Sequence, residues 1–296
     1  MAKDFLYSKK GKPIKIVGIS SSKRSLGDCA AEDPTSLELL KISLKEAEKA
    51  GAKTQLIDLR DFSIGVCKEC YSTCPAQCRF SEVTYQCDCY KRTEPVIWTE
   101  KDGSKTLGEA YDLLDKKEFL KRLNDKHAFV AADDMHVVYK ALLEADGVIF
   151  STFTNYYSRP ALLQSMFSRM CALDGGVEEL WGDGKNLKNS VNYANNPKST
   201  YKQRMYGRFA AFINVSKEGD SVTPDLMKAC SMLGMKIIPL STSYNVQWYD
   251  DHTHRSDKGK TLKDPYTLHL ARHIGKTIVK EAKKSDRSYG KESATV

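Results

Sequence analysis

The sequence predicts an α/β protein built on a doubly wound, five-stranded parallel sheet. Two observations predict this fold class: short apolar runs rich in β-branched residues recur along the chain, and each is followed by a segment with helical spacing. The chain has 296 residues, 41% hydrophobic and 28% charged, with a formal net charge of +8. This composition is typical of a soluble globular protein, and no apolar run approaches the ~18 residues of a membrane span. We therefore expect no membrane partner.

The predicted strands and helices alternate from the N-terminus onward. The first strand is Ile14–Ile19, and the helix that follows has Asp33 as its predicted N-cap and Pro34 at its first position. Gly51 ends this helix. The further strands are predicted at 53–59, 146–150, 208–215 and 236–240. The further helices are predicted after Asp133-Asp134, at 160–171, at 224–233 and around His269 and His273.

We expect one domain over residues 1–296. Within it, residues 65–90 form a cysteine-rich loop. Residues 91–130 are polar, carry a helical pattern over Leu107–Leu123 and are interpreted as an insertion. Residues 242–296 are interpreted as a C-terminal extension with a helix, whose lysines and arginines form a solvated face rather than a nucleic-acid site.

Six of the nine cysteines fall within the 23 residues from Cys67 to Cys89. Thiolates two and three residues apart on a tight loop can all point at one soft metal or cluster. A disulfide framework is the alternative, but the chain starts without a cleavable apolar leader. We therefore favour ligation and expect a cytoplasmic protein.

The favoured ligands are the cysteines that form an unbroken run: Cys67, Cys70, Cys74 and Cys78. Replacement of Cys78 by Cys87 or Cys89 stays open, and a redox-silent zinc ion would use the same thiolates. Of the remaining cysteines, Cys171 and Cys230 fall on helical patterns and are interpreted as buried apolar side chains.

Three polar loops follow predicted strands. The loop Ser20–Ser25 is hydroxyl-rich and basic and leads toward a helix N-terminus, where free amides and the helix dipole favour an anion such as a phosphate. The alternative is a plain polar loop. The loop Ser151–Ser158 offers aromatics, an amide and hydroxyls that suit a flat ring with polar edges, and the fourth strand ends in Ser216–Asp220.

The order of these motifs resembles that of the NAD(P)H-dependent FMN reductases. Within that group the chain is most similar to the iron-sulfur flavoproteins, which carry a cysteine run. The likeness spans residues 14–240 with one long insertion. It rests on Ile19–Arg24, Thr35-Ser36, the cysteine run, Asp133–Met135, Ala145–Gly147 and Ala161–Arg169.

The resemblance implies a flavodoxin-like fold that binds FMN and a [4Fe-4S] cluster. The implied phosphate contacts are Ser20, Ser22, Arg24, Thr35 and Ser36. The implied ring contacts are Thr152, Phe153, Thr154, Asn155 and Tyr156, with Ser216 and Gly219 near the ring's other edge. The chain departs from the family at Lys23 and Phe153, which replace common prolines, in the long loop from Leu26 to Asp33, and in the spacing of its cysteines.

We therefore expect an FMN-dependent oxidoreductase that moves electrons from ferredoxin or NAD(P)H to a small-molecule or protein acceptor. The family also implies a homodimer or homotetramer. One alternative is an NAD(P)H-dependent FMN, quinone or nitro reductase with structural zinc at the cysteines. Another is a metal-stapled binding module without flavin. No Ser-His-Asp order supports hydrolysis, and no catalytic residue is assigned.

Overall fold

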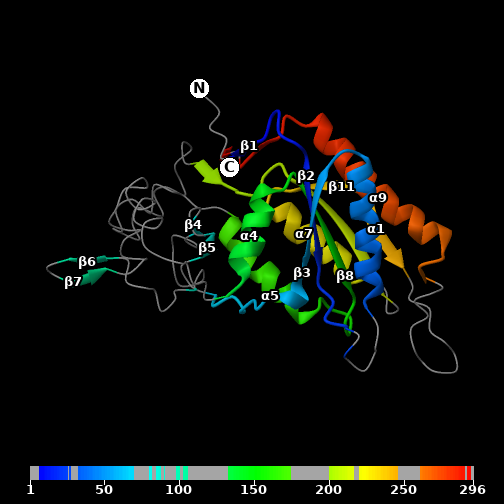
Figure 1. Ribbon diagram of the computed structural model, residues 1–296, viewed down its shortest axis with the longest axis horizontal. Coiled ribbons are helices and arrows are strands. Elements are labelled where there is room, and N and C mark those ends of the chain that lie inside the picture. Colours follow the sequence, from blue (N-terminus) through cyan, green and yellow to red (C-terminus); the bar gives the residue numbers. More distant parts are fainter. Residues whose placement is uncertain are drawn as a thin grey trace.

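Five strands form one parallel sheet in a computed structural model of the chain (Figure 1). The structure describes residues 7–25, 27, 33–69, 80–81, 85–87, 90, 98–100, 103–105, 133–174, 200–216, 220–245, 261–290 and 292–294. The strand order is β11-β10-β8-β2-β3, the flavodoxin-like order, so the predicted fold class is confirmed. The strands are β2 Lys15–Ser20, β3 Lys53–Asp58, β8 Gly147–Phe153, β10 Phe209–Val215 and β11 Lys236–Asn245.

Helices cover both faces of this sheet. On one face lie α1 (Thr35–Lys49) and α9 (Pro265–Lys284), and on the other lie α4 (Met135–Glu144), α5 (Ala161–Arg169) and α7 (Val222–Met232). Alternate strand residues therefore enter different cores: Val148 and Phe150 pack with α4, α5 and α7, whereas Ile149 packs with α1 and α9. Burial on both faces explains why the strands read as continuous apolar runs.

A close approach joins α1 to α9. A Cβ atom on Gly275 would lie 2.0 Å from the backbone oxygen of Ser43, so glycine is required at this contact. The Ser43 hydroxyl donates to the backbone oxygen of Ala271 at 2.6 Å. The C-terminal helix α9 thus completes, together with α1, the helical layer on this face of the sheet.

Two predicted boundaries need correction. The first helix begins at Thr35, with Pro34 rather than Asp33 at the N-cap position. The last strand runs on to Asn245 instead of ending at Leu240, and its pairing with β10 shifts between Ala210 and Phe212. The predicted helix over Leu107–Leu123 lies outside the described residues.

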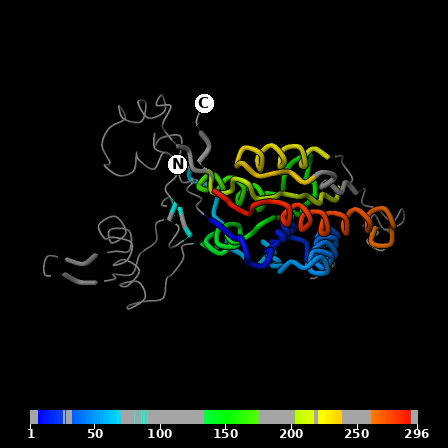
Figure 2. Tube along the Cα trace, turned by 90° about the horizontal axis from the view of Figure 1, so that it is seen from above, coloured from blue at the N-terminus to red at the C-terminus, as the bar shows by residue number. Residues whose placement is uncertain are grey.

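Short strands and 3-10 helices make up the rest of the described secondary structure. The first strand, β1, pairs with β12, so the blue start and red end of the described chain lie side by side in Figure 2. These elements are β1 Tyr7–Ser8, η1 Leu59–Asp61, β4 Phe80–Ser81, β5 Gln86–Cys87, β6 Trp98–Glu100, β7 Gly103–Lys105, η4 Met170–Leu173, β9 Thr200–Lys202, β12 Ser288–Tyr289 and β13 Glu292–Ala294. Among the described residues, no helix is both long and apolar enough to cross a membrane.

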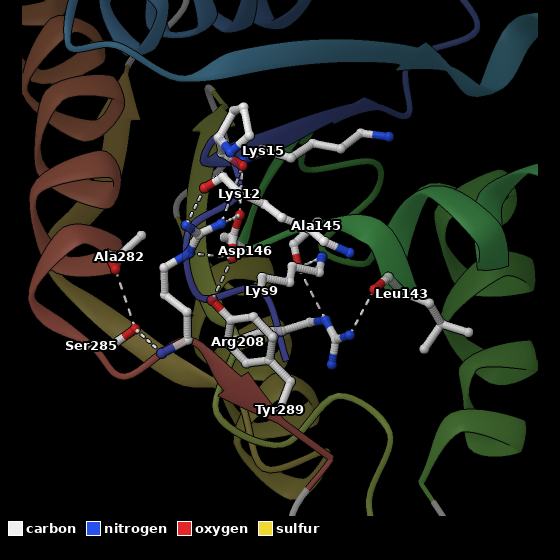
Figure 3. A network of polar contacts seen from close by, with 12 residues as sticks. Lys9, Lys12, Lys15, Leu143, Ala145, Asp146, Arg208, Ala282, Ser285 and Tyr289 are labelled. Carbon is white, nitrogen blue, oxygen red and sulfur yellow. Dashed lines mark hydrogen bonds and ion pairs between the residues drawn. The ribbon is translucent and has the colours of Figure 1, made fainter. Parts of the chain in front are cut away.

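A buried carboxylate organises the amino end of the sheet (Figure 3). Asp146 is fully buried and accepts hydrogen bonds from the Lys15 amide at 2.8 Å, the Tyr289 hydroxyl at 2.7 Å and the Arg287 guanidinium at 2.9 and 3.0 Å. Beside it, Arg208 donates to the backbone oxygens of residues 143, 145 and 204. Strand β2, the start of β8 and the C-terminal segment are therefore tied together.

Lys9 should make stability depend on pH. Burial, and after it the nearby Arg208 charge, lower the pKa of Lys9 to about 7. Between about pH 7 and pH 10 the unfolded chain then binds more protons than the folded one, so the free energy of unfolding rises with pH. We expect Lys9→Met to flatten this rise in denaturant titrations. Lys45→Met, on the exposed side of α1, should keep the wild-type slope, and equal slopes in wild type and Lys9→Met would contradict the assignment.

Candidate functional site

Buried hydroxyl groups gather where three strands end. The strands β2, β8 and β10 are parallel, so their carboxyl ends share one edge of the sheet, the edge where open α/β sheets bind ligands. The buried polar residues that end these strands, follow them or open α1 are Ser20, Ser21, Ser22, Thr35, Ser36, Thr152, Thr154 and Ser216. Seven of these were predicted to contact FMN, and Ser21 was not.

Ser21 and Ser151 connect β2 and β8 to α1. The Ser21 hydroxyl donates to Thr152 Oγ1 at 2.9 Å, and the Ser21 amide donates to the backbone oxygen of Ser151 at 3.1 Å. The Ser151 hydroxyl donates to the backbone oxygen of Ser36 at 2.8 Å. These bonds fix the loop after β2 against the first turn of α1.

Two hydroxyls at this junction have no hydrogen-bond partner in the described part of the chain. Ser20 Oγ and Thr35 Oγ1 are buried, and neither bonds to any residue that the structure describes. A buried polar group without a partner costs about 1–3 kcal/mol. The first turn of α1 also presents backbone N–H groups that have no intrahelical acceptor. An oxyanion would accept from both kinds of donor, so the residues present fit the predicted phosphate.

Arg60 holds the loop after β2 beside α1. Its guanidinium pairs with Asp58 at 2.6 Å and with Asp33 at 3.0 Å, and it donates to the backbone oxygen of Arg24 at 2.6 Å. Arg24 itself is half-buried, and its amide lies 3.5 Å from Ser22 Oγ. Asp33 therefore serves this clamp, next to the helix start.

A tight turn after β8 displays two tyrosines. Asn155 and Ser158 exchange backbone hydrogen bonds of 2.9 and 3.0 Å, and the intervening Tyr156 and Tyr157 have φ angles of 46° and 60°. Left-handed backbone is uncommon for residues other than glycine, and such positions cluster at functional sites. The two side chains are 86% and 67% exposed. They are available to a flat ligand or to a protein surface.

Asn214 is a site residue that sequence reasoning missed. It lies inside the apolar run of β10, is buried, and donates from Nδ2 to Asp220 Oδ1 at 2.8 Å and to Thr154 Oγ1 at 3.3 Å. Its Oδ1 atom has no hydrogen-bond partner among the described residues. The sequence did carry one signal for this residue, because a side-chain amide is unusual within a predicted buried strand. Of the remaining predicted contacts, Phe153 is half-buried, Asn155 is exposed and Gly219 lies outside the described residues.

Two thiols from separate segments approach each other near the end of α5, and a third interacts with one of them electrostatically. Cys67 follows β3, Cys87 ends β5, and Cys171 lies in η4. The Cys67 and Cys171 thiols are within hydrogen-bonding reach, Cys87 interacts electrostatically with Cys171, and none of the three is in a disulfide. No set of three or more His, Cys, Asp or Glu within the described ranges is placed to hold a metal ion. The predicted ligands Cys70, Cys74 and Cys78, and the alternative Cys89, lie outside these ranges.

A buried ion pair positions the segment that leads to Cys67. Arg169, whose side chain is 1% exposed, donates from Nη1 to Asp133 Oδ2 at 2.6 Å and to the backbone oxygen of Gly65 at 3.3 Å. Asp133 Oδ2 also accepts from the Gly65 amide at 3.2 Å. Its other oxygen, Oδ1, accepts from the Met135 amide at 3.2 Å, at the start of α4. Both backbone groups of Gly65 are thereby held.

Tyr90 closes this arrangement, which we call the Arg169 network: Gly65, Tyr90, Asp133 and Arg169. The guanidinium carbon lies 3.5 Å from the centroid of the Tyr90 ring, and the Tyr90 hydroxyl donates to the backbone oxygen of Val66 at 2.5 Å. A Cβ atom on Gly65 would lie 2.1 Å from this hydroxyl. Glycine is therefore required where the segment passes beneath the ring.

The positive charge of Arg169 affects the pKa of two thiols. Burial raises the pKa of the Cys87 thiol, and the positive charge of Arg169 opposes this rise. Burial also raises the pKa of Cys67, opposed by the hydrogen bond from the Glu69 amide and to a smaller extent by Arg169. The interpretation of Cys171 as a buried apolar side chain needs correction, because Cys171 is half-buried and its thiol reaches Cys67.

Comparisons with known proteins show the fold. A crystal structure of RosB with the bound intermediate 8-demethyl-8-formylriboflavin-5'-phosphate matches with a TM-score of 0.51 and 13% identity, over 91% of this chain and 79% of that chain. An azoreductase from Bacillus anthracis strain Sterne has a TM-score of 0.46 and 12% identity, over 92% and 100% of the two chains. An NADH:FMN oxidoreductase (EMOB) in its apo form has a TM-score of 0.46 and 9% identity, over 94% of each chain. No protein-family model and no curated protein matches the sequence.

Removing an unpartnered hydroxyl should not destabilise the ligand-free protein. We expect Thr35→Val to leave the free energy of unfolding unchanged or to raise it by up to about 1 kcal/mol, because no hydrogen bond is lost. Ser43→Ala is the matched control in the same helix: its hydroxyl bonds to Ala271, so its loss should cost about 1 kcal/mol. Denaturant unfolding of the apoprotein measures both. A loss in Thr35→Val as large as that in Ser43→Ala would contradict the assignment.

Proposed function

We propose that this protein is an FMN-dependent oxidoreductase that also carries a [4Fe-4S] cluster and moves electrons between a reduced donor and an acceptor. The observation that carries the flavin assignment is the pair of unpartnered buried hydroxyls, Ser20 and Thr35, at the carboxyl edge of a flavodoxin-like sheet. The RosB structure, which shares the fold, holds a riboflavin phosphate derivative, and this supports the same ligand class here.

The phosphate would lie between the loop after β2 and the start of α1. Ser20, Ser22, Thr35 and Ser36 would donate hydrogen bonds to it, together with the first amides of α1. Arg24 would supply the positive charge that an ionised phosphate needs. The clamp of Arg60 on the backbone of Arg24 would keep this loop in place before the ligand arrives.

The ring would lie against the loops that follow β8 and β10. Thr152, Phe153, Thr154, Asn155 and Tyr156 would border one side, and Ser216 and Gly219 the other. Asn214 adds a contact that the sequence did not predict, because its buried Oδ1 can accept a hydrogen bond from a ring N–H. The exposed Tyr156 ring would cover the ligand from the solvent side.

The thiols would hold the second redox group. Cys67, Cys70, Cys74 and Cys78 are the proposed ligands, with Cys87 or Cys89 as replacements for Cys78. When bound, FMN supplies two-electron transfer and the cluster supplies one-electron transfer, so together they can convert one mode into the other. The Arg169 network holds Gly65 and Val66, so it would set where the cluster segment leaves the sheet.

The donor and the assembly follow the same proposal. Ferredoxin or NAD(P)H would deliver electrons, and a small molecule or a protein would accept them. A homodimer or homotetramer would bring a second copy to the exposed tyrosines after β8, Tyr156 and Tyr157. We keep the domain division at residues 65–90, 91–130 and 242–296 as a proposal, although β11 crosses its last boundary.

The phosphate assignment can be tested by comparing FMN with riboflavin, which lacks the phosphate. Arg24→Ala and Thr35→Val should each weaken FMN binding by about tenfold, the equivalent of one charge-assisted hydrogen bond, and leave riboflavin binding unchanged. Ser43→Ala should change neither affinity. Flavin fluorescence titration of the apoprotein measures both dissociation constants. Equal losses for FMN and riboflavin, or no FMN binding by wild type, would contradict the proposal.

A further inference from the structure

Thr223 carries a second unpartnered polar atom close to Asn214. Its Oγ1 atom is buried and, like Asn214 Oδ1, makes no hydrogen bond to any residue that the structure describes. The two residues come from β10 and from the first turn of α7. They meet at one atom, because Asp220 Oδ1 accepts from Asn214 Nδ2 at 2.8 Å and from the Thr223 amide at 2.9 Å. Both unpartnered atoms therefore belong to side chains gathered around one carboxylate.

The Asp220 carboxylate decides which atom of the Asn214 amide is left without a partner. An ionised carboxylate only accepts hydrogen bonds, so the amide turns its NH₂ group toward Asp220. The remaining Oδ1 atom can only accept, whereas the hydroxyl of Thr223 can donate. Buried donors and acceptors are costly when they stay unpaired. A ligand that offers one donor and one acceptor would pair both.

The two helix starts at this edge of the sheet suit different chemical groups. At α7 the Asp220 carboxylate already accepts an amide of the first turn, and its negative charge disfavours an anion there. At α1 the N-cap residue Pro34 makes no side-chain hydrogen bond to the helix, and the hydroxyls of Ser20 and Thr35 have no partner in the described structure. A ligand with one phosphate and one neutral polar end fits this edge in one orientation, with its neutral end at α7.

We propose that Asn214 and Thr223 bind the imide edge of the flavin ring. This edge carries an N–H group between two carbonyl oxygens. The N–H would donate to Asn214 Oδ1, and one carbonyl oxygen would accept from Thr223 Oγ1. The inference rests on the proposed function, because it takes FMN as the ligand. It goes further by adding Thr223 to the site and by naming the end of the ring that is buried against α7.

The test compares FMN with N3-methyl-FMN, in which a methyl group replaces the hydrogen of the imide nitrogen. Wild-type apoprotein should bind N3-methyl-FMN at least about tenfold more weakly than FMN, since the buried Oδ1 loses its donor and meets a methyl group. This comparison needs no substitution. In Asn214→Ala the same methyl group should cost about threefold or less, because the acceptor is gone and space is left. Flavin fluorescence titration gives the four dissociation constants, and thermal unfolding checks that the ligand-free variant folds.

Thr223→Val tests the second contact, because valine keeps the shape of threonine and removes the hydroxyl. It should weaken FMN binding about fivefold to tenfold. Ser231→Ala is the matched control: it removes an exposed hydroxyl from the other end of α7 and should change neither affinity.

Three results would overturn the inference and leave the proposed function standing. These are equal binding of FMN and N3-methyl-FMN by wild type, the same cost of the methyl group in Asn214→Ala as in wild type, and unchanged FMN binding by Thr223→Val. Wild type that binds neither FMN nor riboflavin would overturn the proposed function and this inference with it.

Discussion

The buried carboxylate of Asp146 is the contact on which the rest of the fold depends. It lies between the strands β2 and β8 and binds the Lys15 amide, Arg287 and Tyr289, so segments from both ends of the described chain meet on one group. Loss of the Arg287 side chain would leave the buried carboxylate without its ion-pair partner, which costs about 3–5 kcal/mol. Because this network occupies the amino end of the sheet, it holds the described segments around Lys15 and Arg287 away from the carboxyl edge.

The two edges of the sheet differ in how completely their polar groups are paired. At the amino edge all three nitrogens of Arg208 donate to backbone oxygens. At the carboxyl edge Ser20, Thr35 and Asn214 each keep a buried atom without a partner in the described structure. Native structures pair most of their buried polar groups, so such exceptions mark the positions where ligands are expected.

Much of the fold could be predicted because it follows from local patterns. The apolar runs predict the five strands and their alternation with helices, and Ser20 and Thr152 lie at the predicted carboxyl ends of two of these strands. Long-range contacts could not be predicted: Asp33 pairs with Arg60, and Cys171 meets Cys67 only through folding. The role of Asn214 could not be predicted for a related reason, since its hydrogen-bond partners lie near the end of another strand and in a following loop. The spacing of residue types in the sequence predicts the secondary structure of a single segment. It carries little information on which helices, strands and loops contact one another in the fold.

The most direct test of the central claim is a joint assay of flavin, iron, acid-labile sulfide and zinc in full-length protein purified without oxygen. The proposal predicts FMN together with iron and sulfide in the same preparation, with a broad brown absorbance shoulder beneath the flavin bands. Stoichiometric zinc without sulfide would leave a plain flavin reductase with a structural metal. Protein that neither contains FMN nor binds it when FMN is added would contradict the account of the carboxyl edge.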